Sequence, residues 1–215
     1  MRQTCPKSCP SAKEPFSGFH LYNYRAGESF LIEAGELNHL VFVISGKLTL
    51  DSEECSGLEV GKGSFLFCYN CGHYAIEAKS DLQIVIAHFA RPGAACDVAS
   101  LLQFSKAQRD FQYKFEPVPI NKQLNEFLSL LIGFLKDDVP CAHMHHSMIE
   151  LLFVVFRFYY DVEVLSNLFF NLFDHAVSFR TMVEGNRVKA RNLNHLAELC
   201  GYDINTFNVV FRRHY

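Results

Sequence analysis

Side chains that can read DNA gather near the C-terminal end of the sequence. Asparagine pairs with adenine edges in the major groove, and arginine pairs with guanine or with phosphate. These residue types alternate with apolar residues at helical spacing, so a short helix would expose them on one side. We therefore predict DNA contacts by Asn205, Thr206, Asn208, Arg212, Arg213 and Arg191.

The same segment predicts two short helices around Gly201. One face of the first helix carries the apolar residues Leu193, Leu196, Ala197 and Cys200. The second helix would direct Phe207, Val210 and Phe211 towards the same core. Glycine suits the turn between them because it adopts a positive φ without strain. This is the arrangement of a helix-turn-helix, although helix pairs that serve only packing use it as well.

Charge is distributed unevenly along the chain. The formal net charge of −3 argues against indiscriminate binding of nucleic acids. Residues 179–215 nevertheless hold six basic and three acidic side chains, so this end is net +3 and the remainder is net −6. A basic segment on an acidic body is expected when one part of a protein meets phosphate.

Cysteine and histidine side chains could serve a different chemistry, the binding of metal ions. The spacing of half a zinc site is found at Cys68, Cys71 and His73. A structural zinc site needs four ligands, and the natural second pair is absent. Another group begins a predicted helix and consists of Cys141, His143, His145 and His146. A solvated helix end explains this group more simply, so we expect reduced thiols, no bound metal and no cofactor.

The first half of the sequence is organised as short β-strands separated by turn residues. Seven runs have strand character, at 19–24, 29–33, 39–44, 47–50, 64–68, 73–77 and 82–89. Strands that recur about every 8–12 residues with glycine-rich punctuation predict an antiparallel sandwich or barrel. We favour a barrel here.

Helical spacing largely replaces the strands after Pro92. We predict a helix at 98–108 and a last strand at 111–115. Three helices should follow: one that Asn121 caps at its N-terminus, one at 141–161 and one at 164–175. The first of these three has an apolar stripe, which a barrel alone would not cover: Leu124, Phe127, Leu128, Leu131 and Leu135. We therefore expect a homodimer that forms through the helices.

The composition favours a soluble protein. No stretch reaches the roughly 18 uninterrupted apolar residues that a membrane helix needs. Residues 1–19 lack the apolar core of a secretory signal, and the eight cysteines are scattered over a chain long enough to fold without disulfides. We expect a cytoplasmic location and no membrane partner.

The C-terminal pattern resembles the first helix-turn-helix of AraC-family transcription regulators. The resemblance rests on Leu196-Ala197-x-Leu199-x-Gly201-Tyr202, followed by Thr206-Phe207-Asn208 and Phe211-Arg212-Arg213. It implies an α+β fold in which a cupin-like barrel senses a small molecule, a helical linker forms dimers, and the C-terminal part binds specific DNA sequences. The implied parts are an arm at 1–18, the barrel at 19–116, the linker at 117–175 and a partial DNA-binding domain at 176–215.

Two features depart from the family pattern. The family's DNA-binding domain has two helix-turn-helix units joined by a long helix, whereas this sequence ends after the first recognition helix. Many relatives also carry a basic residue at the position of Val209. We therefore expect weak, salt-sensitive DNA binding, with tight binding requiring residues that would follow Tyr215.

Within the implied barrel, residues 35–50 and 61–78 match the two halves of a cupin pattern loosely. Metal cupins place a His-x-His and a Glu in the first half and a His in the second, but the His-x-His is missing here. The interior of such a barrel would still be a mostly apolar cavity that suits a small ligand. We expect this pocket to be lined by His39, Phe42, Phe67, His73 and His88.

No nucleophile elbow, phosphate-cradling loop or carboxylate pair stands out, so we do not expect an enzyme. The predicted function is that of a ligand-responsive transcription regulator that binds double-stranded DNA and an unknown effector. Two alternatives stay open. One is a dimerising sensor fragment that does not bind an operator by itself. The other is a metal-dependent cupin enzyme, which would require a metal near His39 and His73.

Overall fold

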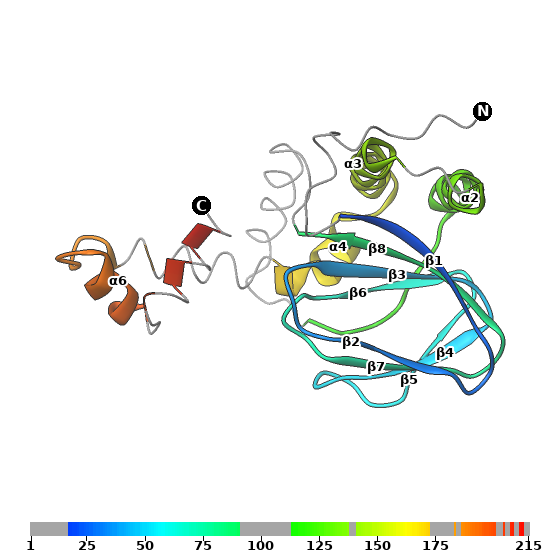
Figure 1. The fold of residues 1–215 in the computed structure, drawn as a ribbon, viewed down its shortest axis with the longest axis horizontal. Coiled ribbons are helices and arrows are strands. Elements are labelled where there is room, and N and C mark those ends of the chain that lie inside the picture. The colour runs from blue at the N-terminus through cyan, green and yellow to red at the C-terminus, as the bar shows by residue number, and fades with distance from the viewer. Residues whose placement is uncertain are drawn as a thin grey trace. The chain divides into compact units, whose positions relative to one another are not determined.

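The computed structural model describes residues 17–90, 113–137, 141–172, 183, 186–200, 204, 207, 208, 211 and 212. The chain divides into two compact units, Met1–Phe169 and Phe170–Tyr215. Figure 1 shows the helices and strands of both units, with labels on all but β9. The helix predicted at 98–108 and most of the arm predicted at 1–18 lie outside the described residues.

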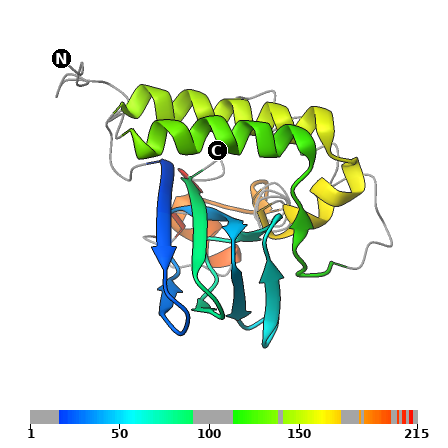
Figure 2. The same cartoon turned by 90° about the vertical axis from the view of Figure 1, so that its right-hand side faces the viewer.

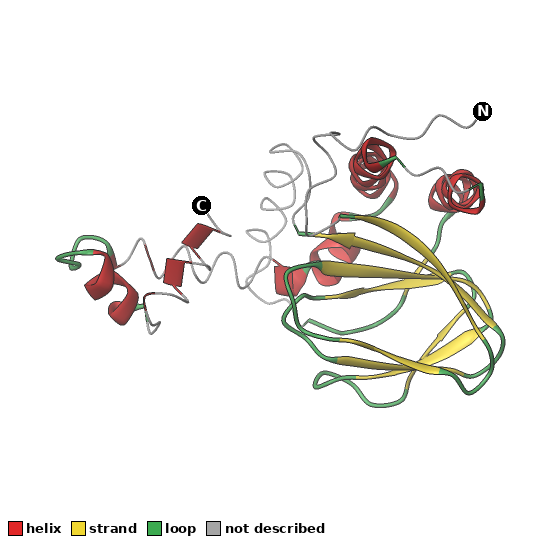
Figure 3. Ribbon diagram, in the orientation of Figure 1, coloured by secondary structure: helices red, strands yellow, loops and turns green. Residues whose placement is uncertain are grey.

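The first unit contains two antiparallel β-sheets. Sheet A consists, in spatial order, of β1 (Gly18–Tyr24), β8 (Leu82–Phe89), β3 (Asn38–Ser45), β6 (Ser64–Cys68) and β9 (Val118–Pro119). Sheet B consists of β2 (Ser29–Ile32), β7 (Tyr74–Ala78), β4 (Lys47–Asp51) and β5 (Leu58–Gly61). Figure 3 shows the strands of the two sheets as separate yellow layers that face each other.

The strand order is that of a jelly roll. The first eight strands form the orders β1-β8-β3-β6 and β2-β7-β4-β5, and successive strands change sheet except at β4 and β5, an architecture that cupins share. The cupin-like expectation is therefore supported, but the expected closed barrel is wrong. The described strands form two separate hydrogen-bonded sheets, and packing between their faces takes the place of closure.

All seven predicted strands are present, each with ends within one residue of the prediction. Sequence analysis missed β5, a strand of only four residues between glycines, and β9, whose two residues lie in a proline-rich segment. The strand predicted at 111–115 is not formed by its described residues, Tyr113 to Phe115. Val118 pairs with Phe65 instead, three residues further along the chain.

The core between the sheets is built from alternating side chains. Val41, Leu66 and Ile84 of sheet A meet Leu50 and Ile76 of sheet B, and all five are essentially inaccessible to solvent. Because side chains alternate along a strand, the residues between these positions point to the other face of each sheet. On sheet A that other face is also buried.

Aromatic side chains fill the space between sheet A and the helices. In the described part of the chain, the cover consists of α2 (Lys122–Lys136), α3 (Ala142–Tyr159) and α4 (Val162–Leu168). Figure 2 shows α2 and α3 side by side across sheet A. The ring centroids of Phe65 and Phe156 are 5.5 Å apart, and those of Phe89 and Phe153 are 5.3 Å apart. No helix in the described part of the chain is long and apolar enough to cross a membrane.

Hydrogen bonds fix the start of α2 against the end of α3. The side chain of Asn121 caps α2, as predicted, by accepting a bond of 2.9 Å from the amide of Leu124. Its amide group donates to the carbonyl of Tyr159 at 2.7 Å, and its backbone N–H donates to the hydroxyl of Tyr160 at 3.1 Å. Tyr160 in turn donates to the carbonyl of Pro119 at 2.9 Å, next to sheet A.

The apolar stripe of α2 does not offer the surface expected for a dimer. Leu124, Phe127, Leu128 and Leu131 are buried and Leu135 is half-buried within the same chain. Phe127 packs on Phe19 of β1 with ring centroids 6.0 Å apart. The sandwich and α3 together cover what an isolated barrel would have left exposed.

The second unit has a small core of its own. Asn192 caps α6 (Leu193–Leu199) by accepting a bond of 2.9 Å from the amide of His195. Helical backbone is also present at Ile204, Phe207, Asn208, Phe211 and Arg212. Four buried residues form the core: Val183, Ala197, Cys200 and Phe207.

Two glycines allow a test of the turns that join the strands. Gly46 has φ +82° and Gly63 has φ +80°, so Gly46→Ala and Gly63→Ala each place an L side chain in the left-handed region at a cost of about 1–2 kcal/mol. A Cβ at Gly46 would also overlap the backbone carbonyl of Asp81, whereas the space at Gly63 is open. Urea unfolding should therefore show a loss for Gly46→Ala on the order of 3 kcal/mol or more, clearly larger than for Gly63→Ala. Equal losses would contradict this account of the β3–β4 turn.

Candidate functional site

Two histidines face each other at one end of sheet A. His39 on β3 lies directly opposite His88 on β8, and the two Nδ1 atoms are 2.9 Å apart. By strand alternation, both side chains point to the same side as Val41 and Ile86, which belong to the core between the sheets. Cys68 on β6 lies opposite His39 on its other side, and it is buried in that core.

A third histidine extends this row towards the edge of the sandwich. The ring of His20 on β1 lies edge-on to that of His88, with centroids 5.1 Å apart. His20 is exposed to solvent, whereas His39 and His88 are mostly buried. Three imidazoles therefore lead from the solvent-exposed edge into the sandwich.

Burial keeps the imidazoles neutral. It lowers the pKa of His39 to about 4, because the charged form would lose its hydration. It lowers the pKa of His88 to about 3, with a further contribution from the neighbouring His39 and His20. Burial also lowers the pKa of His20.

The hydrogen bond of the pair leaves one ring atom available for a ligand. One Nδ1 carries a proton and donates the hydrogen bond, and the other Nδ1 accepts it. In the donating ring Nε2 is therefore an acceptor, and in the accepting ring Nε2 is a donor. Among the described side chains, Nε2 of His88 is the one buried nitrogen or oxygen without a hydrogen-bond partner. An unpaired buried polar group is unfavourable, so a ligand group that reached this atom would gain a favourable bond.

The described residues do not fit a resident metal ion. No three His, Cys, Asp or Glu side chains in the described part of the chain are placed so that they could hold one. The Nδ1 atoms of His39 and His88 are directed at each other in a hydrogen bond. The two cysteines of the zinc-like spacing also differ in burial, since Cys68 is buried and Cys71 is exposed.

The five residues predicted to line one pocket are not brought together. His39 and His88 share the inner face of sheet A, but Phe42 and Phe67 point to its outer face, where they join the aromatic layer under the helices. His73 is exposed at the start of β7. The spacing of residues along the sequence could not reveal this separation, because it depends on which face of the sheet each strand position occupies.

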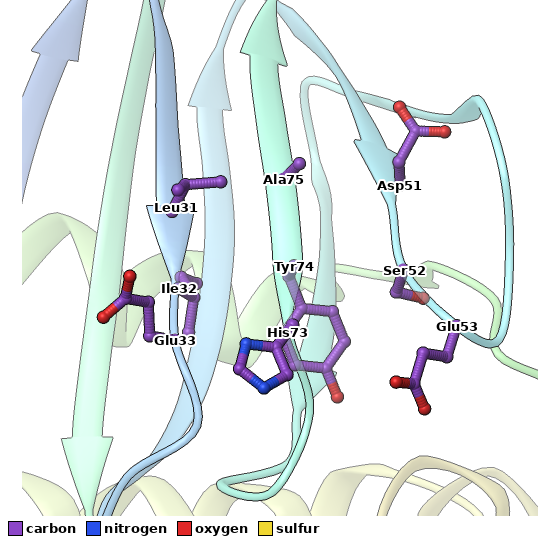
Figure 4. Close-up of a pocket in the computed structure, with 9 residues that line it drawn as sticks. All are labelled: Leu31, Ile32, Glu33, Asp51, Ser52, Glu53, His73, Tyr74 and Ala75. Carbon is purple, nitrogen blue, oxygen red and sulfur yellow. The ribbon is translucent and has the colours of Figure 1, made fainter.

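His73 lines a different pocket, of about 520 Å³, on the solvent side of sheet B. Figure 4 shows Glu33 and Glu53 on opposite sides of His73, with Leu31 directed towards Ala75. A third carboxylate, Asp51, already accepts bonds from the amide of Gly57 and the hydroxyl of Ser56, which lower its pKa. The lining is therefore acidic with an apolar floor.

Sequence analysis missed the roles of two histidines, because it did not single out His20 and considered His145 only within a possible metal-binding group. His20 could have been recognised from strand parity, because it shares the inward-facing positions of β1. His145 gave no such signal. Its Nδ1 accepts a bond of 3.2 Å from the amide of Phe19 and so ties α3 to β1, while burial lowers its pKa.

Three of the six predicted DNA-contacting residues are described. Arg191 is exposed just before α6, Asn208 is half-buried on helical backbone, and Arg212 is exposed on helical backbone. The backbone N–H of Arg191 donates to Nδ1 of His195 at 3.2 Å, which holds the backbone of Arg191 beside the first turn of α6. The other three, Asn205, Thr206 and Arg213, lie outside the described residues.

No protein-family model and no curated protein matches the sequence. Similar solved structures include a cupin 2 conserved barrel domain protein from Leptotrichia buccalis, which is 22% identical with a TM-score of 0.33, the match covering 35% of this chain and 36% of that chain. The Cnp3 cupin domain of Schizosaccharomyces pombe is 14% identical with a TM-score of 0.32, over 35% of this chain and 57% of that domain. A cupin superfamily protein from Desulfitobacterium hafniense is 17% identical with a TM-score of 0.31, over 35% and 70%.

The match therefore spans between about a third and a little over half of the first two proteins. Because the TM-scores are this low, the similarity to these structures indicates nothing about the functional site of this chain. The cupin-like architecture rests on the strand order of the chain itself.

The lowered pKa values predict that acid destabilises the sandwich. In the unfolded chain a histidine takes up its proton near pH 6.5, whereas His39 and His88 in the folded chain resist protonation until about pH 4 and about pH 3. The free energy of unfolding should thus fall as the pH drops below about 6.5, by up to about 1.4 kcal/mol per pH unit for each group.

Urea unfolding between about pH 7 and about pH 5 measures this dependence. His39→Gln should reduce the slope of the unfolding free energy against pH, because one of the two histidines with a lowered pKa is removed. His73→Gln is the matched control at an exposed histidine and should keep the slope of the unsubstituted protein. A stability that does not change over this range would show that the imidazole pair is not held neutral by the fold.

Proposed function

We propose that this protein is a ligand-responsive transcription regulator. The sandwich of the first unit binds a small effector, and the second unit binds double-stranded DNA through a helix-turn-helix. The protein acts as a homodimer and binds its effector without transforming it. The proposal combines the sequence pattern around Gly201 with the core of the second unit.

The observation that carries the proposal is the shared core on the two sides of Gly201. Ala197 and Cys200 precede this glycine, Phe207 follows it, and all three are buried in one cluster. Phe207 and Phe211 also pack together, with ring centroids 5.6 Å apart. Helical residues before and after a short connection thus pack on one another, as the helices of a helix-turn-helix do.

Charge supports the same assignment. Arg187, Lys189 and Arg191 are exposed just before α6, and Arg212 is exposed on the following helical residues. Backbone phosphates attract such side chains without regard to sequence, whereas base edges select asparagine and arginine. We assign Arg191 to phosphate and assign Asn208 and Arg212 to bases.

The row of histidines supports effector binding in the sandwich. The imidazoles of His39 and His88 are neutral and mutually hydrogen-bonded, and Nε2 of His88 lacks a partner among the described residues. A neutral, directional group of this kind suits recognition of a polar atom on a small ligand. It does not supply the charged acid and base of a hydrolytic site.

Two arginine substitutions and one asparagine substitution test DNA binding. With labelled duplexes from the protein's own promoter region, Asn208→Ala and Arg212→Ala should each remove about 1–3 kcal/mol of discrimination between specific and scrambled sequence. Arg191→Ala should weaken binding to both duplexes alike and lower the slope of log affinity against log salt by about 1. Fluorescence anisotropy at several salt concentrations measures both quantities.

Arg25→Ala is the matched control, because Arg25 is exposed on the turn between β1 and β2 of the sandwich. It should bind both duplexes like the unsubstituted protein. If Arg25→Ala and Arg212→Ala reduce binding equally, the contact is a general effect of charge. If the protein binds neither duplex even at low salt, the regulator proposal fails.

A further inference from the structure

The outer face of sheet B carries a groove that is separate from the effector site proposed between the sheets. Helices α2, α3 and α4 lie on the side of sheet A, so no described helix covers this outer face (Figure 1). The groove is the pocket of about 520 Å³ at His73, and cavities of this size are typical of small-ligand sites. A ligand held here would contact solvent-side residues of sheet B and none of the histidine row.

Strand register builds an apolar floor for the groove. Leu31 of β2 lies directly opposite Ala75 of β7, and Figure 4 shows the side chain of Leu31 directed towards Ala75. Leu31 is 68% exposed, and the small side chain of Ala75 leaves room beside it. A methylene chain laid across these two residues would remove apolar surface from water on both sides of the contact.

Carboxylates lie on both sides of this floor. Strands β2 and β4 both run antiparallel to β7, so the segments that follow β2 and β4 meet the residue that precedes β7 at one end of the sheet. These segments supply Glu33 and Glu53, and Figure 4 shows the two carboxylates on opposite sides of the ring of His73. Because β7 separates β2 from β4, the segments that carry the two carboxylates lie about 10 Å apart, across two strand spacings.

The two carboxylates of the groove have no cation of their own. Among the described residues neither Glu33 nor Glu53 forms an ion pair, whereas two lysines at the opposite end of this face are already paired. Those ion pairs are Lys47–Glu59 at 2.6 Å and Lys79–Glu77 at 2.7 Å. The groove therefore presents negative charge that the described part of the chain does not neutralise.

The placement of these groups decides which kind of cation fits. A divalent metal ion needs several oxygen ligands that converge on one point, and no three His, Cys, Asp or Glu side chains in the described part of the chain do so. Two separated negative charges with apolar surface between them instead suit a ligand that has a cation at each end and methylene groups in the middle. Lysine side chains lie on protein surfaces in the same manner, with the stem on apolar groups and the ammonium beyond them.

We propose that the groove on sheet B binds an aliphatic diamine. One ammonium group donates hydrogen bonds to Glu33 and the other donates to Glu53, while the methylene chain lies over Leu31 and Ala75. A chain of about four to five carbons, with a charge-assisted hydrogen bond of about 2.8 Å at each end, matches the span between the two carboxylates. The site uses no residue of the histidine row or of the DNA-binding assignment, so it stands or falls independently of both.

Calorimetric titration of the full chain with 1,5-diaminopentane tests the site. Salt at about 0.15 M screens non-specific attraction between exposed charges. E33Q/E53Q should weaken binding by about tenfold, because both charge-assisted hydrogen bonds are lost. E59Q/E126Q is the matched control, since it also removes two exposed carboxylates but none from the groove, and it should bind the diamine like the unsubstituted protein.

Two further measurements separate the charges from the apolar floor. Pentylamine has the same carbon chain with a single ammonium group, so it should bind the unsubstituted protein several-fold more weakly than the diamine. L31S should weaken binding of the diamine several-fold, because the methylene chain loses an apolar contact while both carboxylates remain. Circular dichroism and urea unfolding establish that each variant is folded.

Three results would overturn the inference. They are a lack of binding at millimolar 1,5-diaminopentane, equal binding of pentylamine and the diamine, and equal losses in E33Q/E53Q and E59Q/E126Q. A pentalysine peptide that binds the unsubstituted protein but not E33Q/E53Q, while the diamine does not bind at all, would also overturn it and would assign the groove to a basic protein partner.

Discussion

Burial of both faces of sheet A is the constraint on which the rest of the first unit depends. In β3 and β8 the runs from Val41 to Val43 and from Ile84 to Ala87 are almost inaccessible to solvent at every position. Strands that are apolar on both sides need a layer on each face. Sheet B supplies one layer, and the helices that follow the sandwich in sequence supply the other.

This constraint explains why the helices are part of the sandwich unit. The aromatic layer joins Phe65 to Phe156 and Phe67 to Phe169, residues separated by about ninety to one hundred positions in the sequence. The bonds of Asn121 and Tyr160 then fix α2 against the end of α3. The helices and the sandwich therefore share one packed core, so neither can shift without disturbing the packing of the other.

The same burial sets the chemistry of the histidine row. His39 and His88 lie on the side of sheet A that faces sheet B, where a charged imidazole would lose hydration without gaining a counter-charge. They remain neutral and bond to each other, and this leaves Nε2 of His88 without a partner among the described residues. An effector in the sandwich would therefore meet a preorganised polar atom in an otherwise apolar setting.

The sequence by itself determined the local elements. Alternation and turn residues located seven strands to within one residue, Asn121 marked the start of α2, and the apolar residues around Gly201 identified both sides of the second core. These features depend on residues only a few positions apart, so the local sequence pattern is enough to predict them.

Only the tertiary structure decided which faces meet. It separated Phe42 and Phe67 from His39, added His20 to the row, divided the expected barrel into two sheets, and buried the stripe of α2 while leaving Leu151, Val154 and Phe158 exposed on α3. Each of these outcomes depends on contacts between segments distant in sequence. A periodic pattern states that a helix or strand has an apolar face, but the partner that covers this face is chosen by the packing of the whole unit.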